Sequence, residues 1–196
     1  MRLPEAPVWR PPAGARPPQP IGTWLRASSS LTHRLQRACG PEFAVRVLSQ
    51  SWGHPLPDEA RRLGLAPGRR AFVRRVQLLC GGVPWVFGRT VIPPHALHGR
   101  HRRLLRLGAR PLGAVLFADP DLRRERAELA RLLPAHALYA DAGCPAGDAL
   151  WARRRRYRLQ GHTLLVTEVF LPALTRPAPP EPPLRRLDHR SGPRRG

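Results

Sequence analysis

The stretch Pro84–Pro93, PWVFGRTVIP, has the period of a β-strand, and the rest of the sequence is interpreted around it. Side chains alternate between the two faces of a strand. Trp85, Phe87, Arg89 and Val91 therefore share one face, which is apolar apart from the arginine. Burying an unpaired guanidinium is costly. Arg89 is expected either to reach water from an edge strand or to face a cavity that receives an anion.

Further strands are predicted on both sides of this stretch. The run 71–80 precedes it, and Gly81-Gly82 between the two gives the spacing of a tight antiparallel hairpin. Another strand is predicted over 43–52. Towards the C-terminus, 151–160 and 163–171 form a second pair of alternating runs joined by two residues, which indicates a second hairpin.

Helices are predicted between these strands. The run Ser-Ser-Ser at 28–30 can cap a helix that begins near Leu31, and Gly40-Pro41 ends it. Leucines at helical spacing predict a second helix over 121–133, and 134–148 has the composition of a loop. The order of elements predicts a single-domain α+β fold, an antiparallel sheet of about six strands with helices on one side.

The composition is strongly basic. All 34 basic residues among the 196 are arginines, and the formal net charge is +21. Such a charge suits binding to nucleic acid or to another acidic surface. The absence of lysine favours instead a coding bias towards arginine, and the usual DNA- and RNA-binding motifs are absent. Nucleic acid is therefore not an expected partner.

Prolines, of which the chain has 25, are concentrated at the two ends. We expect a disordered Pro-rich arm over 1–21 and a disordered Pro/Arg-rich tail over 176–196. The folded domain then spans 22–175.

The three cysteines, Cys39, Cys80 and Cys144, form neither a Cys-x-x-Cys pair nor the spacing of a zinc site. Reduced thiols in a cytoplasmic protein are expected. No run approaches the 18 apolar residues of a membrane helix, and the N-terminus lacks the apolar core of a signal peptide.

Glu168 occupies the same kind of position on its predicted strand as Arg89 does. It is the one ionisable residue on a face shared with Leu164, Val166 and Phe170. A structural ion pair between Arg89 and Glu168, or two separate edge positions, would explain both residues. The alternative is a closed pocket in which an arginine holds a carboxylate, for which its planar fork is suited, while the glutamate bonds a hydroxyl.

Three segments together resemble the chorismate pyruvate-lyase family. They are PWVFGRTVIP at 84–93, PLGAVLF at 111–117 and LLVTEVFLP at 164–172, in this order, and the similarity extends over roughly 22–175. The resemblance implies cleavage of chorismate to 4-hydroxybenzoate and pyruvate, the first committed step of bacterial ubiquinone biosynthesis. It implies no metal and no organic cofactor. It also implies an antiparallel sheet with helices that act as flaps over an enclosed product site.

The resemblance also implies roles for individual residues. Arg89 would hold the ring carboxylate, and Leu112 would offer its backbone to that carboxylate. Glu168 would bond the ring hydroxyl. Leu31, where family members can have methionine, would line the site from a covering flap. Leu31 and the pair Ala114-Val115 depart from the family pattern, so altered packing and product release are expected rather than lost chemistry.

Chorismate carries two carboxylates, so a second cation is expected at the site. Arg75, on the strand paired with 83–92, is the first candidate, and Arg155 is another. Loss of the enolpyruvyl group makes the ring aromatic, so the protein need mainly hold the anion, exclude water and stabilise charge on the leaving group. Whether Glu168 transfers a proton or only orients the hydroxyl is left open by the sequence.

A second hypothesis is a non-catalytic module that binds a small aromatic acid. The same type of fold resembles the effector domain of certain bacterial transcription regulators. Those proteins carry a winged helix-turn-helix domain ahead of it, for which 1–21 are too few residues. The expected partners are chorismate and 4-hydroxybenzoate, with no nucleic acid and no membrane span, and the expected state is a monomer.

Overall fold

The computed structural model describes residues 6–27, 29–145 and 147–175. The predictions made for 1–5, for Ser28 and for the tail 176–196 lie outside the described residues.

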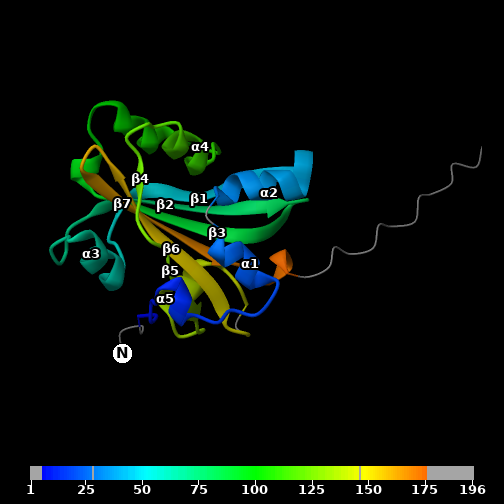
Figure 1. Cartoon of the computed structure of the whole chain (residues 1–196). Helices are drawn as coiled ribbons and strands as arrows, with labels where there is room; N and C mark the ends of the chain where they lie inside the picture. Colours follow the sequence, from blue (N-terminus) through cyan, green and yellow to red (C-terminus); the bar gives the residue numbers. More distant parts are fainter. Residues whose placement is uncertain (1–5, 28, 146, 176–196) are drawn as a thin grey trace, which may run out of the picture.

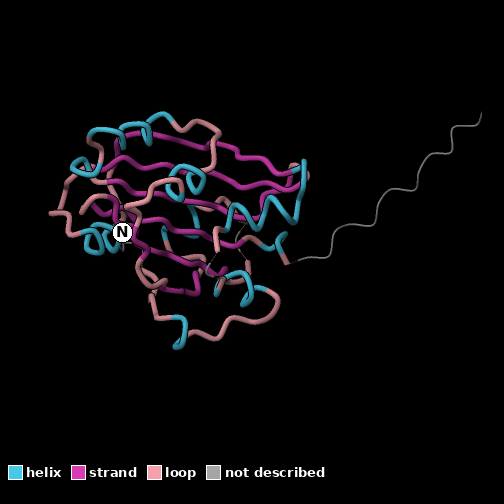
Figure 2. The backbone as a smooth tube through the Cα atoms, turned by 45° about the horizontal axis from the view of Figure 1, so that its top comes forward, coloured by secondary structure: helices cyan, strands magenta, loops and turns pink. Residues whose placement is uncertain are grey.

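One antiparallel sheet of seven strands forms the centre of the molecule (Figure 1). Its hydrogen-bonded strands follow the order β1-β2-β3-β7-β6-β4, and β5 also pairs with β6. Figure 2 shows the strands, in magenta, running side by side with helices around them. The strands are β1 (Phe43–Gly53), β2 (Ala71–Cys80), β3 (Val83–Ile92), β4 (Arg123–Arg124), β5 (Glu128–Leu132), β6 (Leu150–Leu159) and β7 (His162–Phe170).

Both predicted hairpins are confirmed. Gly81 and Gly82 connect β2 to β3, and both residues have positive φ, as a tight two-residue hairpin turn requires. The second turn is made by Gln160 and Gly161, also at positive φ, one residue earlier than the sequence indicated.

The sheet has two buried faces. We name the one that carries Val76, Val86 and Phe170 the α2 face, and the one that carries Phe87 and Val169 the α3 face. Helices cover both faces, which corrects the expectation of helices on one side. The α2 face is covered by α1 (Ile21–Arg26), α2 (Leu31–Cys39) and α4 (Leu112–Phe117), and the α3 face by α3 (Pro57–Leu63) and α5 (Ala137–Asp141).

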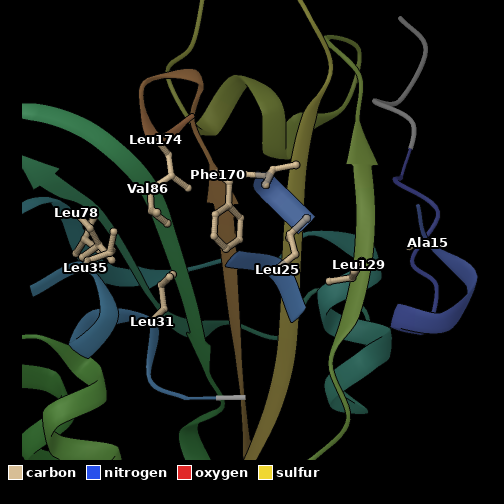
Figure 3. Packing of buried hydrophobic residues seen from close by; sticks show 11 residues of the cluster. Ala15, Leu25, Leu31, Leu35, Leu78, Val86, Leu129, Phe170 and Leu174 are labelled. Carbon is tan, nitrogen blue, oxygen red and sulfur yellow. The ribbon is translucent and has the colours of Figure 1, made fainter. Parts of the chain in front are cut away.

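Helix α2 begins where the sequence predicts. The Ser30 side chain accepts a hydrogen bond from the backbone N–H of His33, and Gly40 ends the helix at a φ of 56°. Leu31 and Leu35 are buried on the α2 face, in one cluster with Leu78 and Val86 (Figure 3). This packing holds the start of α2 close to the sheet.

A disulfide joins Cys39, the last residue of α2, to Cys80, the last residue of β2. The prediction of three free thiols is therefore wrong for these two residues, and Cys144 is the free thiol among the described cysteines. The two partners are 41 residues apart, so no local spacing signals them. Packing of α2 beside the β2 end brings them together.

The helix predicted over 121–133 is also wrong, because the segment contains β4 and β5. Leu129 packs on the α2 face, whereas Ala130 and Leu132 pack on the α3 face. The leucine spacing fits a helix equally well, but pairing with β6 satisfies the backbone and lets both cores bury apolar side chains. Part of the predicted 134–148 loop is likewise helical, as α5.

The described part of the N-terminal arm packs on the body, which differs from the expected disorder. Arg10 and Leu129 exchange two backbone hydrogen bonds of 2.9 and 2.8 Å at the free edge of β5. Trp9 donates from Nε1 to Asp58 Oδ2 at 3.0 Å. Among the described residues, none of the helices has the length and apolar character needed to cross a bilayer.

Candidate functional site

A cavity lies on the α2 face, between the sheet and two covering segments. The floor comes from β1, β2, β3, β6 and β7. The cover comes from 29–32, which we name the N-terminal flap, and from 111–117, which we name the α4 flap. The flaps meet at Gly113, where an added Cβ would lie 3.3 Å from Ser30 Oγ and 3.4 Å from Thr32 Oγ1. The polar and charged side chains around the cavity are those of Ser29, Ser30, Thr32, Arg74, Thr90, Arg153, Tyr157 and Glu168.

Arg74 on β2 is a buried guanidinium whose hydrogen bonds go only to neutral acceptors. Its Nε donates to Gln50 Oε1 at 3.0 Å, and its Nη2 donates to the backbone oxygens of Gly108 and Arg110 at 3.0 and 3.1 Å. Only 2% of Arg74 is exposed. Burial lowers its pKa to about 10, so it stays charged at neutral pH. Among the described residues no carboxylate pairs with it, and this leaves its charge open to an anionic ligand.

Glu168 on β7 and Arg153 on β6 stand opposite each other in the sheet and form a salt bridge, Nε to Oε2, of 2.7 Å. Burial alone would lower the pKa of Arg153, but the charge and hydrogen bond of Glu168 outweigh burial and raise it. Glu168 is thus paired as a carboxylate, which can only accept hydrogen bonds. With Arg74, the cavity holds two guanidinium groups and one carboxylate, a net positive charge.

Tyr157 forms the neighbouring wall of the cavity and packs edge-to-face against Phe117 of the α4 flap, with ring centroids 6.3 Å apart. Burial and the charge of Glu168 raise the pKa of its phenol, despite the nearby arginines. Arg155 is one of these arginines and favours a lower pKa of the phenol, and its own Nε is buried without a hydrogen-bond partner among the described residues. Arg155, the second candidate cation, therefore lies next to the cavity, although it does not line it.

Arg89 lies on the other side of the sheet. β3 pairs with β7 so that Gly88 stands opposite Glu168 and Arg89 opposite Thr167. Partners in a ladder point to the same side, so Arg89 and Glu168 lie on opposite faces. The expected pocket lined by both residues and the alternative ion pair between them are therefore both wrong.

On the α3 face, Arg89 has both Glu59 and Asp141 as partners. Nε and Nη2 donate to the two oxygens of Glu59 at 2.8 and 3.0 Å, and Nη1 donates to Asp141 Oδ2 at 2.9 Å. Burial lowers the pKa of Arg89, but these carboxylates outweigh burial and raise it. All three guanidinium nitrogens are occupied, which leaves no donor nitrogen without a partner for a ligand.

Arg75 is likewise on the α3 face, where it bonds Ser49 Oγ at 2.8 Å and Asp141 Oδ1 at 3.0 Å. It is therefore not the second cation of the cavity. Leu31 and Leu112 do line the cavity, one from each flap. The structure thus brings Leu31, Leu112 and Glu168 together and leaves Arg75 and Arg89 out.

Comparison with known proteins gives the family. Residues 3–177 match the family model described as chorismate lyase. The chain belongs to this family. A probable chorismate pyruvate-lyase of Azoarcus sp. (strain BH72) is 47% identical over 171 residues, covering 82% of this chain and 90% of the relative. One of Aromatoleum aromaticum is 43% identical over 182 residues, covering 89% and 97%.

Solved structures of lower identity share the fold. PhnF from Mycobacterium smegmatis aligns at 16% identity with a TM-score of 0.54, over 77% of this chain and 67% of that one. The effector domain of PhnF aligns at 17% identity with a TM-score of 0.53, over 75% and 91%. At such identities the likeness shows the fold alone.

Two site residues of this chorismate lyase family member escaped the sequence analysis. Arg74 shares its strand face with Phe72, Val76 and Leu78, the same pattern that singled out Arg89, so alternation could have found it. Arg153 belongs to the run Arg153–Arg156, for which strand alternation predicts at least half of the side chains in water. Instead Arg153 and Arg154 are both buried, one on each face of the sheet.

Proposed function

We propose that this protein eliminates pyruvate from chorismate to give 4-hydroxybenzoate, the first step of ubiquinone biosynthesis. Membership of the chorismate lyase family supports this reaction. The observation that carries it is the buried Arg74, which has no carboxylate partner among the described residues and lines the same cavity as Glu168. Such an arginine suits a carboxylate, and an ionised glutamate suits a hydroxyl.

Arg74 takes the role that the sequence analysis gave to Arg89, that of holding the ring carboxylate. Leu112 lines the cavity just after the 108–110 loop that Arg74 bonds, so its backbone is placed near the same carboxylate. Glu168 accepts a hydrogen bond from the ring hydroxyl. Leu31 supplies apolar cover from the N-terminal flap.

In the reaction, the bond between the ring carbon and the enol-ether oxygen breaks and a ring proton leaves. The ring becomes aromatic, and the leaving enolate takes up a proton to become pyruvate. The protein needs to hold the dianion, exclude water and stabilise the charge that develops on the leaving oxygen. The positive charge of the cavity serves the first and third of these needs. A second cation binds the enolpyruvyl carboxylate, and the candidate for this role is Arg155, beside Tyr157.

The test is turnover of chorismate by the purified protein. Pyruvate is followed with lactate dehydrogenase and NADH, and 4-hydroxybenzoate by its absorbance, in buffer with excess EDTA because no metal is expected to take part. Equal release of both products by the wild type, with loss in Arg74→Met, is the expected result. Chorismate left intact while 4-hydroxybenzoate still binds would overturn catalysis and favour the non-catalytic effector-like module.

We further propose that the protein is a monomer located in the cytoplasm. The Cys39–Cys80 disulfide is unusual for a reducing compartment. Thiol titration of protein isolated under non-reducing conditions tests the location: one thiol per chain indicates that the bond forms in the cell, and three thiols fit a reducing cytoplasm.

A further inference from the structure

Arg153 connects two parts of the molecule that the proposed chemistry needs at the same time. Its Nε donates to Glu168 Oε2 at 2.7 Å. Its Nη1 donates to the backbone oxygens of Trp24, Leu25 and Ala27 at 3.4, 3.4 and 2.9 Å. One guanidinium, 3% exposed, thus joins the carboxylate of the site to the segment that leads into the N-terminal flap.

The three carbonyl oxygens belong to the C-terminal end of α1. The last carbonyls of a helix have no partner within the helix, and this end carries partial negative charge that attracts a cation. Trp24 O also accepts a hydrogen bond from the Ala27 backbone N–H at 3.4 Å. Arg153 can reach the three oxygens only while 24–27 is seated on the sheet. Lifting that segment would leave the guanidinium without its carbonyl acceptors.

The flap begins two residues after Ala27. Leu31 in the flap lines the cavity and is buried against the sheet, so the seating of 24–27 fixes where the cover lies. At the other end of the contact, the bond from Arg153 is the one hydrogen bond that the Glu168 side chain makes within the described residues. The orientation of Glu168 therefore depends on the position of Arg153.

We propose that Arg153 is a positioning residue that couples closure of the N-terminal flap to the orientation of Glu168. With the flap seated, the guanidinium is fixed and Glu168 presents its second oxygen to the ring hydroxyl. With the flap lifted for product release, Glu168 loses that orientation and its hold on the product. The role of Glu168 rests on the proposed function, whereas the coupling itself is a property of the ligand-free protein.

Hydrogen–deuterium exchange of the backbone amides of 29–35, measured on ligand-free protein, tests the coupling. Arg153→Lys keeps the charge but replaces the planar fork by one ammonium group, which cannot serve both sets of acceptors in the same geometry. These amides are expected to exchange about tenfold faster. Glu168→Gln is expected to speed exchange at the same amides, because coupling is reciprocal, although the Glu168 side chain bonds Arg153 and not the described flap residues 29–32.

Arg154→Lys is the matched control. Arg154 is a similarly buried neighbour, but it bonds Asp58 and Glu128 on the α3 face, so flap exchange should stay at the wild-type rate. Wild-type flap exchange in both Arg153→Lys and Glu168→Gln would overturn the coupling. If Arg153→Lys does not fold, Glu168→Gln decides alone.

The same samples separate the two proposals. If the wild type releases pyruvate and the flap amides of both variants exchange at the wild-type rate, the coupling is overturned and the lyase function stands. If the wild type releases no pyruvate but the flap amides exchange faster in the variants, the lyase function is overturned and the coupling stands. In active protein, Arg153→Lys should also lower the affinity for 4-hydroxybenzoate by about tenfold, whereas Arg154→Lys should not.

Discussion

The two faces of the sheet bury arginines in opposite ways. On the α3 face, Arg89 has every donor nitrogen matched to Glu59 or Asp141, and these carboxylates raise its pKa. On the α2 face, Arg74 meets an amide and two carbonyls, and burial lowers its pKa to about 10. Burial of an arginine therefore does not by itself mark a ligand site. The number of carboxylates within reach separates a structural ion pair from a site for an anion.

The largest effect is expected on the α3 face, from Arg89→Met. Glu59, which is 3% exposed, would lose its bidentate partner and remain as an uncompensated buried charge. The free energy of unfolding, measured in urea, should fall by about 3–5 kcal/mol. Arg75→Met is the control, since Arg75 shares Asp141 but its side chain is 38% exposed, and it should cost no more than about 1 kcal/mol. Equal stability of both variants would mean that the Arg89 cluster does not hold this face.

Arg74→Met should give the opposite pattern. Removing Arg74 leaves no buried carboxylate unpaired, but three neutral acceptors lose their donor. The free energy of unfolding should therefore fall by less than in Arg89→Met, by about 1–3 kcal/mol. Activity should fall, because an unpaired substrate carboxylate costs about 2–5 kcal/mol, or roughly 30- to 4,000-fold in kcat/KM. Steady-state kinetics with chorismate and urea unfolding of the same preparation measure both quantities. A large loss of stability with unchanged kcat/KM would make Arg74 structural like Arg89.

The α2 face is also held by the covalent bond at the end of α2. Cys39→Ser should lower the free energy of unfolding by about 2–4 kcal/mol, since the disulfide closes a long loop. Thermal unfolding without reductant measures this loss. Wild-type protein treated with dithiothreitol should show a similar drop, whereas Cys144→Ser, at a free half-buried thiol, should not.

The smallest expected effect is on the stability of the protein at acidic pH. Burial would raise the pKa of Glu128, but hydrogen bonds from Arg154 and Arg62 outweigh burial and lower it below its ordinary value of 4.5. A carboxyl with a lowered folded-state pKa stabilises the protein above its unfolded pKa and loses this contribution as pH falls through the folded one. The unfolding free energy of Glu128→Gln should therefore depend less steeply on pH below 4.5 than that of the wild type. If the unfolding free energies of the variant and the wild type fall with pH in parallel, Glu128 does not contribute to the loss of stability in acid.

Local pattern was sufficient to predict β1, β2, β3, β6 and β7 and both hairpins. Alternation defines the faces of one strand, and paired glycines such as Gly81-Gly82 fix a tight turn. The same hairpin register places Arg75 opposite Arg89 and Arg74 opposite Thr90. Counting across the two-residue turn would instead pair Arg74 with Arg89 on one face. The register shift between Leu78 and Leu79 separates the two arginines, and the hairpin pattern gives no sign of that shift. Which of them faces Glu168 depends on the pairing of β3 with β7, a contact between distant segments that no local pattern reveals.

The helix predicted over 121–133 failed for a related reason. Its leucine spacing fits a helix. However, the segment pairs with β6, and Leu129 and Leu132 pack in two different cores. Segments elsewhere in the chain form that strand and those cores. Arg153 was hidden because a run of four arginines resembles a solvated surface. Its acceptors, Glu168 and the backbone of 24–27, become visible only when the sheet and α1 are assembled.

The short backbone pairing of Arg10 with Leu129 has a consequence for self-association. Unpaired edge strands offer their N–H and C=O groups to a second chain and promote aggregation. The arm covers the outer edge of β5 with two hydrogen bonds and anchors Trp9 on Asp58. A chain shortened to begin at Pro20 should therefore associate at concentrations where the full chain sediments as one species. The proline-rich arm then acts as a built-in guard against strand exchange.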